Sequence, residues 1–304
     1  MSFKVLSSGI FTTLQDRGRY GYTHEGRTSS GAMDEYAYLW SQKLLSNQNA
    51  NALEVMVGLK LKALAPTTVS ITGADLMFSI NGVVQPIWQT YAIDVDDVLS
   101  FEKRVSGQRA YLAVKGGFLF EKSYGSFSTT LKENIGSRLQ RGDTLKFLAL
   151  NSESKIIRFR TSSKAIPDYT KPLTLRLLLS YQEEYFTQDE KEKFFNSDYE
   201  ITLQSDRMGF KLKGQVITPI KGGIISEGIA FGSVQIPKDG QPIVLLKERQ
   251  TIGGYPKIGT VLAIDCFKLS QIPVGEIVRF EIIEIEEAQE IMRTFYSTYF
   301  ALLT

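Results

Sequence analysis

The chain has 304 residues, a length that favours two domains over one. Its 35 basic and 33 acidic side chains give a formal net charge of +2, so charge offers no support for a nucleic-acid or membrane-surface partner. A single cysteine excludes an intramolecular disulfide, and a single histidine, His24, excludes most catalytic-triad and metal schemes. We therefore expect no metal site, and acid–base chemistry carried mainly by Asp, Glu, Lys or Tyr.

The N-terminal residues lack the long apolar segment of a secretory signal. Nowhere does the sequence reach the roughly 18 uninterrupted apolar residues of a spanning helix. These two observations predict a cytoplasmic protein with no membrane partner.

Short alternating apolar runs predict that the first half consists mainly of strands. The runs lie at residues 69–72, 76–80, 109–114 and 144–148. Asn81-Gly82 predicts a tight hairpin turn that returns through residues 83–84. One helix is predicted from about Asp34 to Leu45, with Asp34 as its N-cap.

The second half begins after a polar stretch at residues 161–172, whose prolines and composition predict a linker. A strand is predicted at 173–179, and a capping box at 187–190 predicts the start of a helix. The apolar run 261–265 predicts a buried strand leading to Cys266, which we expect to be an inert core thiol. A strand at 280–283 precedes a final helix, whose apolar stripe predicts core or partner packing and consists of Ala288, Ile291, Met292, Phe295 and Tyr299.

Both halves are therefore predicted to be mainly β with a few helices, as paired barrels or sandwiches. The expected domains are residues 1–160 and 173–304, joined by the linker at 161–172. A short similarity between residues 18–22 and 206–210 fits a duplicated domain.

Candidate ligand-binding residues gather in the second half. Gly253 and Gly254 allow close approach of the backbone beside Tyr255, and Lys257 offers a cation for a carboxylate or phosphate. The alternative is a tight turn with a surface lysine. Arg207 offers a fork of donors for an anion, next to Asp206, with a structural ion pair as the equal alternative.

Two further side chains suit an amide ligand, and a third is a candidate for proton transfer. Gln235 and Gln250 each carry a donor and an acceptor and could bind an amide or ureido group. Glu227 is the candidate carboxylate for proton transfer. A Walker-type phosphate loop is missing from the sequence, so the chain shows no nucleotide loop of its own.

Several segments together resemble the 5-oxoprolinase C-subunit family, also called allophanate hydrolase subunit 2, KipA or the biotin-dependent carboxyltransferase-like family. The sharpest is 249–258, Arg-Gln-Thr-Ile-Gly-Gly-Tyr-Pro-Lys-Ile, and the others are residues 12–22, 30–34, 51–54, 71–75, 109–117, 125–129, 205–210 and 232–243. They follow one another over nearly the whole chain. Phe127 departs from the family's more usual arginine and Glu248 from its aspartate, so an anion contact at 127 loses its support.

The resemblance implies two cyclophilin-like β-barrel domains and an enzyme subunit. The first function it implies is a part of an ATP-dependent 5-oxoprolinase that opens 5-oxo-L-proline to L-glutamate. Its partners would be a KipI-like subunit and a LamB/YcsF-like subunit, with ATP shared by the complex. Glu227, Arg207 and Lys257 would be catalytic, and the substrate-binding set would be Asp206, Gln235, Gln250, Gly253, Gly254 and Tyr255.

Two other functions remain open from the resemblance. One is a carboxyltransferase subunit that moves a carboxyl group from carboxybiotin to urea or a related amide, which would bring in biotin. The chain has no biotin-accepting segment of its own, so partners would have to carry it. The other is a non-catalytic KipA-type regulatory partner of a KipI-like protein.

Overall fold

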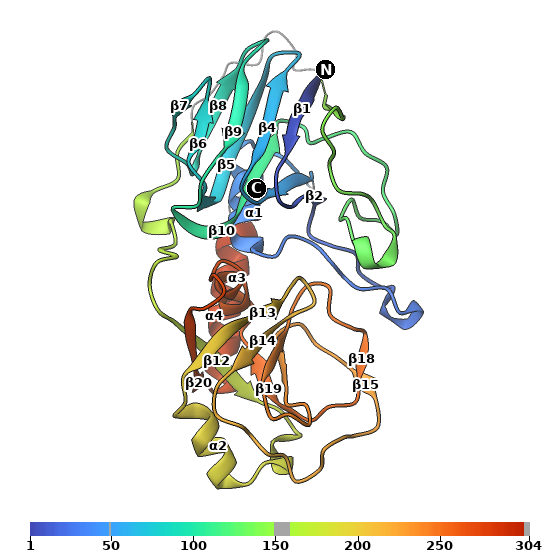
Figure 1. Cartoon of the computed structure of the whole chain (residues 1–304), viewed down its shortest axis with the longest axis vertical. Coiled ribbons are helices and arrows are strands. Elements are labelled where there is room, and N and C mark those ends of the chain that lie inside the picture. The colour runs from blue at the N-terminus through green and yellow to red at the C-terminus, as the bar shows by residue number, and fades with distance from the viewer. Residues whose placement is uncertain (49, 149–158, 301–304) are drawn as a thin grey trace. The chain divides into compact units, whose positions relative to one another are not determined.

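The computed structural model describes residues 1–48, 50–148 and 159–300 as two compact units (Figure 1). The first unit combines Met1–Tyr20 with Ser30–Thr170, apart from the residues that are not described, and the second combines Gly21–Ser29 with residues 171–300. The division expected from the sequence kept residues 1–160 together and set 161–172 apart. In the structure, residues 161–170 pack with the first unit, where the buried Tyr169 hydroxyl donates to the Asp34 carboxylate at 2.6 Å.

The first unit contains two sheets. The six-stranded sheet has the order β11 (Thr144–Lys146), β1 (Ser2–Ser8), β4 (Leu59–Ala63), β9 (Val98–Phe101), β6 (Phe78–Ile80) and β7 (Val83–Val84). The five-stranded sheet has the order β2 (Thr12–Gln15), β3 (Ala52–Val55), β10 (Ser106–Val114), β5 (Thr67–Asp75) and β8 (Gln89–Ile93). All of these pairings are antiparallel.

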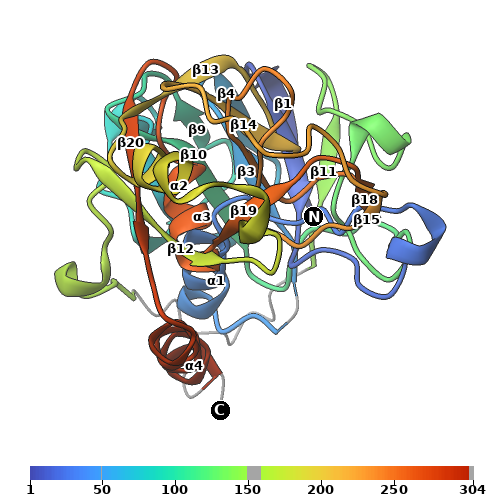
Figure 2. The same ribbon diagram turned by 90° about the horizontal axis from the view of Figure 1, so that it is seen from below.

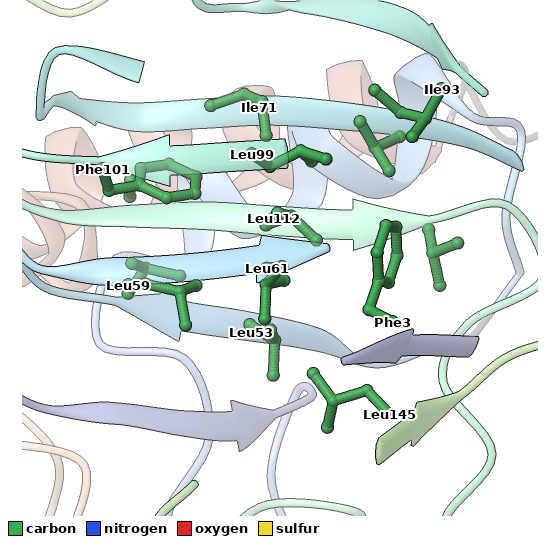
Figure 3. Close-up of a cluster of buried hydrophobic side chains, with 14 of the residues drawn as sticks. Phe3, Leu53, Leu59, Leu61, Ile71, Ile93, Leu99, Phe101, Leu112 and Leu145 are labelled. Atoms are coloured by element: carbon green, nitrogen blue, oxygen red, sulfur yellow. The ribbon is translucent and has the colours of Figure 1, made fainter. Parts of the chain in front are cut away.

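Alternating side chains of both sheets form one hydrophobic core. Phe3, Leu61 and Leu99 come from the six-stranded sheet, whereas Leu53 and Leu112 come from the five-stranded sheet (Figure 3). All five are essentially inaccessible to solvent. Since side chains of a strand alternate between its two faces, this burial fixes the register of the strands.

The hairpin predicted at Asn81-Gly82 is confirmed. Strands β6 and β7 pair antiparallel, with Ile80 opposite Val83. Asn81 and Gly82 have φ of 53° and 80°, the left-handed values that a type I′ turn requires at both central positions.

The helix predicted near Asp34 is also confirmed, as α1 (Glu35–Leu44). The Asp34 carboxylate accepts a hydrogen bond from the Ala37 amide at 3.0 Å, which is an N-cap contact. The hydroxyls of Thr72 and Ser70 on β5 donate to carbonyls of this helix, at 2.6 and 2.7 Å. The helix is thereby fixed to the five-stranded sheet.

The second unit is a closed barrel in the order β12 (Leu173–Leu179), β19 (Lys257–Val261), β16 (Ser233–Gln235), β17 (Ile243–Leu245), β14 (Gly209–Lys213), β13 (Tyr199–Ser205) and β20 (Ile277–Ile282). Parallel pairing of β12 with β20 closes it. A separate two-stranded ribbon pairs β15 (Glu227–Gly228) with β18 (Ile252–Gly253). The predicted mainly β fold is thus confirmed.

Short 3-10 helices occur in both units. They are η1 (Thr23–Glu25), η2 (Leu131–Glu133), η3 (Ser163–Ala165) and η4 (Glu183–Tyr185). The helix predicted to begin near residue 187 is confirmed as α2 (Gln188–Phe195), with the Thr187 hydroxyl accepting from the Glu190 amide at 3.3 Å. The Glu190 carboxylate accepts from the Thr218 amide at 2.7 Å.

The buried strand predicted at residues 261–265 is wrong. Strand β19 ends at Val261, and Cys266 lies in a helix, α3 (Ala263–Leu269). The buried Asp265 carboxylate accepts from the Arg176 Nε at 2.8 Å and holds this helix against β12. A short apolar run suits a strand or a buried helix equally well. The predicted burial of the Cys266 thiol is confirmed, and burial raises its pKa.

The final helix is α4 (Ile285–Phe300), which follows directly on β20 (Figure 2). Ala288, Ile291 and Met292 belong to one hydrophobic cluster in the second unit, and the Phe295 ring lies 5.9 Å from that of Phe267. Packing against the second unit is therefore confirmed for these four residues, of which Ala288 is buried and the other three are half-buried, whereas the Tyr299 side chain lies outside the described part. Among the described helices, none has both the length and the apolar character needed to cross a membrane.

Candidate functional site

Four of the predicted site residues come together in the second unit. The pairing of β15 with β18 places Glu227 opposite Gly253, and the pairing of β16 with β19 places Gln235 opposite Lys257. The Lys257 ammonium donates to the Glu227 carboxylate, and Gly253 lies against the Gln235 amide. We call these residues, with Tyr181 and Gln182, the Glu227 cluster.

The Glu227 carboxylate is the centre of this cluster. Besides the Lys257 ammonium, it accepts a hydrogen bond from the Tyr181 hydroxyl and one from Gln182 Nε2, the latter at 2.6 Å. The hydrogen bond from Lys257, followed by that from Tyr181, lowers the pKa of Glu227 below its ordinary value. Glu227 is therefore ionised at neutral pH, and proton transfer by this group stays a prediction.

The site combines buried and accessible charge. The Lys257 side chain is 7% exposed and that of Glu227 is 33% exposed. Tyr181 is largely exposed, so the hydroxyl that contacts Glu227 belongs to a side chain in contact with solvent. A cation held in place beside an accessible carboxylate can stabilise charge that develops on a bound ligand.

Tyr181 and Gln182 were missed by the sequence reasoning. Both follow the predicted strand at 173–179 directly, and polar residues at a strand end were the only available signal. Gln182 Oε1 accepts from the Lys257 amide at 2.9 Å, and the Ser180 hydroxyl donates to the Lys257 carbonyl at 2.6 Å. The loop after β12 thus holds the backbone of Lys257.

The side-chain amide of Gln235 is buried in the cluster. Its side chain is 4% exposed, and Nε2 has no hydrogen-bond partner among the described residues. Leaving such a donor unpaired costs about 1–3 kcal/mol. A ligand oxygen or an ordered water at this position would remove that cost.

Of the two glycines predicted to approach a ligand, Gly253 lies in the ribbon and Gly254 follows it directly. A Cβ at Gly253 would come within 2.6 Å of Gln235 Nε2, so only glycine leaves that amide undisturbed. The Gly254 carbonyl accepts from the Ile224 amide at 2.9 Å and supports the turn that follows. Tyr255 is 42% exposed and Gln250 is exposed as well, so both side chains face solvent.

Asp206 and Arg207 take part in different contacts. Asp206 Oδ1 accepts from the Met208 amide at 2.7 Å, which stabilises the turn between β13 and β14. The Arg207 guanidinium donates to the Glu248 carboxylate, with side chains only 9% and 7% exposed. Of the two alternatives weighed for Arg207, the structure shows the buried ion pair.

In the first unit, the segments that carry the family resemblance meet around Asp16. Its carboxylate accepts from the hydroxyls of Ser126 and Ser128, at 2.6 and 2.5 Å, and from the Phe127 amide at 2.8 Å. Residues 12–22 and 125–129 are therefore held together by one carboxylate.

A cavity of about 280 Å³ lies beside the loop that contains Phe127. Phe127, Leu14 and Leu145 contribute to its apolar lining, and the Lys122 ammonium lies 5.0 Å from the centre of the Phe127 ring. Because position 127 is a phenylalanine and not an arginine, this side chain offers no positive charge to an anion in the cavity.

A second buried network joins residues 30–34, 51–54 and 109–117. The Glu54 carboxylate accepts from the Met33 amide and the Tyr111 hydroxyl, both at 2.8 Å. Tyr111 in turn accepts from the Asp34 amide at 2.8 Å. These contacts give the residues a structural role, because they satisfy buried polar groups.

The Glu227 carboxylate already accepts three hydrogen bonds, from Lys257, Tyr181 and Gln182. In the described residues, no group of three or more His, Cys, Asp or Glu side chains could hold a metal ion. The Gln235 donor of the cluster suits the oxygen of an amide or carboxylate.

The sequence is similar to one family model and to proteins of known function. The family model described as "Carboxyltransferase domain, subdomain A and B" matches residues 25–282. The C-subunit of the Escherichia coli 5-oxoprolinase is 31% identical over 94% of this chain and 92% of its own length. The urea amidolyase of Saccharomyces cerevisiae is 24% identical over 95% of this chain, which spans 17% of that protein.

A solved structure shares the whole fold. The urea carboxylase of Kluyveromyces lactis superposes with a TM-score of 0.90 over 99% of this chain, at 22% identity. The chain spans 29% of that protein, and at this identity the likeness concerns the fold alone.

Proposed function

The chain belongs to the carboxyltransferase-domain family that includes the C-subunit of 5-oxoprolinase, and we propose that it is part of an ATP-dependent 5-oxoprolinase complex. The assembled enzyme would open 5-oxo-L-proline to L-glutamate. The observation that carries this proposal is similarity over nearly the whole length of both chains. The urea enzyme, in contrast, is matched over a small part of its length.

The Glu227 cluster supplies groups that the substrate requires. 5-Oxoproline carries a lactam carbonyl and a carboxylate, both of which accept hydrogen bonds. In the proposal, Gln235 Nε2 donates to one of these oxygens, which would satisfy its unpaired donor. The Lys257 ammonium, held by Glu227, stabilises negative charge that develops as the ring opens.

The proposed complex contains two further proteins, a KipI-like subunit and a LamB/YcsF-like subunit. A lactam is unreactive towards water, and ATP would supply the phosphoryl group that activates its oxygen. Because the Glu227 carboxylate already accepts three hydrogen bonds, we assign ATP to the assembled complex and not to this cluster.

The test is glutamate formation from 5-oxoproline and ATP with all three purified subunits. We expect activity only when this chain is present. Lys257→Met should abolish activity in a folded protein, whereas Lys213→Met, at an exposed lysine of the same unit, should leave it unchanged. An intact three-subunit complex that forms no glutamate would overturn the proposal.

A carboxyltransferase acting on urea or a related amide is the second candidate, favoured by the description of the family model and by the fold shared with urea carboxylase. The Gln235 donor would serve a ureido oxygen of biotin or urea equally well. Radiolabelled bicarbonate, ATP, urea, a biotin carboxylase and a biotin carrier should then give labelled carboxyurea only when this chain is added. A chain that binds the KipI-like protein but supports neither reaction would instead be a KipA-type regulator.

A further inference from the structure

Gln182 links three members of the Glu227 cluster through one side chain. Its Oε1 accepts from the Lys257 amide at 2.9 Å, and its Nε2 donates to Glu227 Oε1 at 2.6 Å and to the Tyr181 hydroxyl at 3.0 Å. The side chain is 3% exposed. One amide therefore contacts a barrel strand, the ribbon and its own loop.

We propose that Gln182 is the positioning residue of the site and holds Lys257 and Glu227 in the geometry of their ion pair. The effect of Gln182 on turnover rests on the proposed function. The geometry of the ion pair can be measured in the folded chain alone, without any reaction.

The elements that carry the ion pair are not in the same sheet. Lys257 lies on β19 of the barrel, whereas Glu227 lies on β15 of the two-stranded ribbon. A lysine side chain has four flexible methylenes, so its ammonium is fixed only if both its backbone and its target are fixed. Gln182 contacts the backbone of the lysine and the carboxylate that receives the ammonium.

Only a carboxamide of this length can make these contacts together. The Lys257 amide needs an acceptor, and the Glu227 carboxylate needs a donor. Methionine at position 182 would fill the same volume without either bond. Glutamate would keep the acceptor, lose the donor and place a second negative charge beside Glu227.

The loss of Gln182 should change the pKa of Glu227, which a titration can measure. The titratable groups that face it are Lys257 from β19 and Tyr181 from the loop after β12, and Tyr181 faces Tyr185 of η4 in turn. Hydrogen bonds from Lys257, Tyr181 and Gln182 all lower the pKa of Glu227. Loss of Gln182 removes one of these bonds and loosens the Lys257 contact, so the pKa should rise.

The experiment is a carbon NMR titration of protein labelled at the glutamate side-chain carboxyl carbon, with the Glu227 signal assigned through Glu227→Gln. In Gln182→Met the midpoint should move to higher pH, and in Gln182→Glu it should move further. Gln204→Met, the same change at an exposed glutamine of this unit, should titrate like the wild type. An unchanged midpoint in folded Gln182→Met would overturn the proposal.

Two further measurements separate positioning from simple stabilisation. If Gln182→Met fails to fold, Gln182→Glu decides, because it keeps the acceptor for the Lys257 amide. In the assembled complex, the acidic limb of the pH profile of kcat/KM should move in the same direction as the NMR midpoint. A complex without glutamate formation would refute the proposed function, whereas the titration would still decide the role of Gln182.

Discussion

The side-chain amide of Gln235 lies where a side chain at position 253 would begin, and Gly253 has none. A Cβ built at this glycine would lie 2.6 Å from Gln235 Nε2 and 2.5 Å from the Cδ1 of Ile229. Both atoms are the ends of side chains, so they can move while the backbone stays in place. The conformation of the Gln235 side chain therefore depends on the residue at position 253.

We expect Gly253→Ala to displace the Gln235 amide and to lower kcat/KM for 5-oxoproline by about tenfold, equivalent to about 1.4 kcal/mol. The overpacking should cost about 1 kcal/mol of stability. Gly228→Ala is the matched control, because no atom lies within 4 Å of a Cβ there and Gly228 belongs to the same ribbon. Equal activities of the two variants would contradict the prediction.

Gln235→Met should separate activity from stability. The change removes a buried donor that has no partner among the described residues and keeps the size of the side chain. We expect the free energy of unfolding in urea to stay the same or to rise by about 1 kcal/mol. Activity of the reconstituted complex should fall at least tenfold. A large loss of stability would show that the amide has a structural partner.

Arg207→Ala should act on stability. The Arg207–Glu248 pair is buried, and removal of the arginine leaves a carboxylate in a site with little access to water. Such a change costs about 3–5 kcal/mol. Lys211→Ala breaks the more exposed pair with Asp239 and should cost only about 0–1 kcal/mol.

A double variant tests whether the cost of Arg207→Ala comes from the carboxylate of Glu248 that is left unpaired. Arg207→Met combined with Glu248→Met should recover part of the lost stability, because no unpaired charge then remains buried. Loss of activity in Arg207→Ala without loss of stability would instead return Arg207 to the site.

Tyr169→Phe should destabilise the first unit. The buried Tyr169 hydroxyl donates to the Asp34 carboxylate at 2.6 Å, and hydrogen bonds to charged groups contribute about 1.5–3 kcal/mol. Urea unfolding at neutral pH should show a loss in this range. Tyr255→Phe, at an exposed tyrosine, should unfold like the wild type.

The pH dependence of the Tyr169→Phe effect has a definite sign. Burial, and then the charge of Asp34, raise the pKa of Tyr169 well above its ordinary value. Its stabilising contribution is complete below the ordinary tyrosine pKa of about 10 and is lost as the pH rises above that value. The difference between wild type and Tyr169→Phe should therefore shrink between about pH 9 and pH 11. A constant difference would contradict this assignment.

Local sequence patterns predicted the elements that depend on local contacts. Asn81-Gly82 satisfied the two left-handed positions of its turn, and Asp34 and Thr187 capped the helices that follow them. The prediction for 261–265 was wrong because a short apolar run suits a strand or a buried helix equally well. The contact that holds this helix against β12 joins Asp265 to Arg176, which is distant in sequence.

The sequence by itself determined the family, the mainly β fold and a set of candidate residues in the second half. Its residue types also made candidates of Lys257 as a cation for an anion, Gln235 for an amide, Gly253 for close backbone approach and Glu227 for proton transfer. Only the tertiary structure decided which candidates meet. Arg207 has a buried partner in Glu248, whereas Gln182 lies 45 positions from Glu227 and 75 from Lys257 and still contacts both. Strand pairing brings such residues together, and the spacing of residues along the chain does not reveal it.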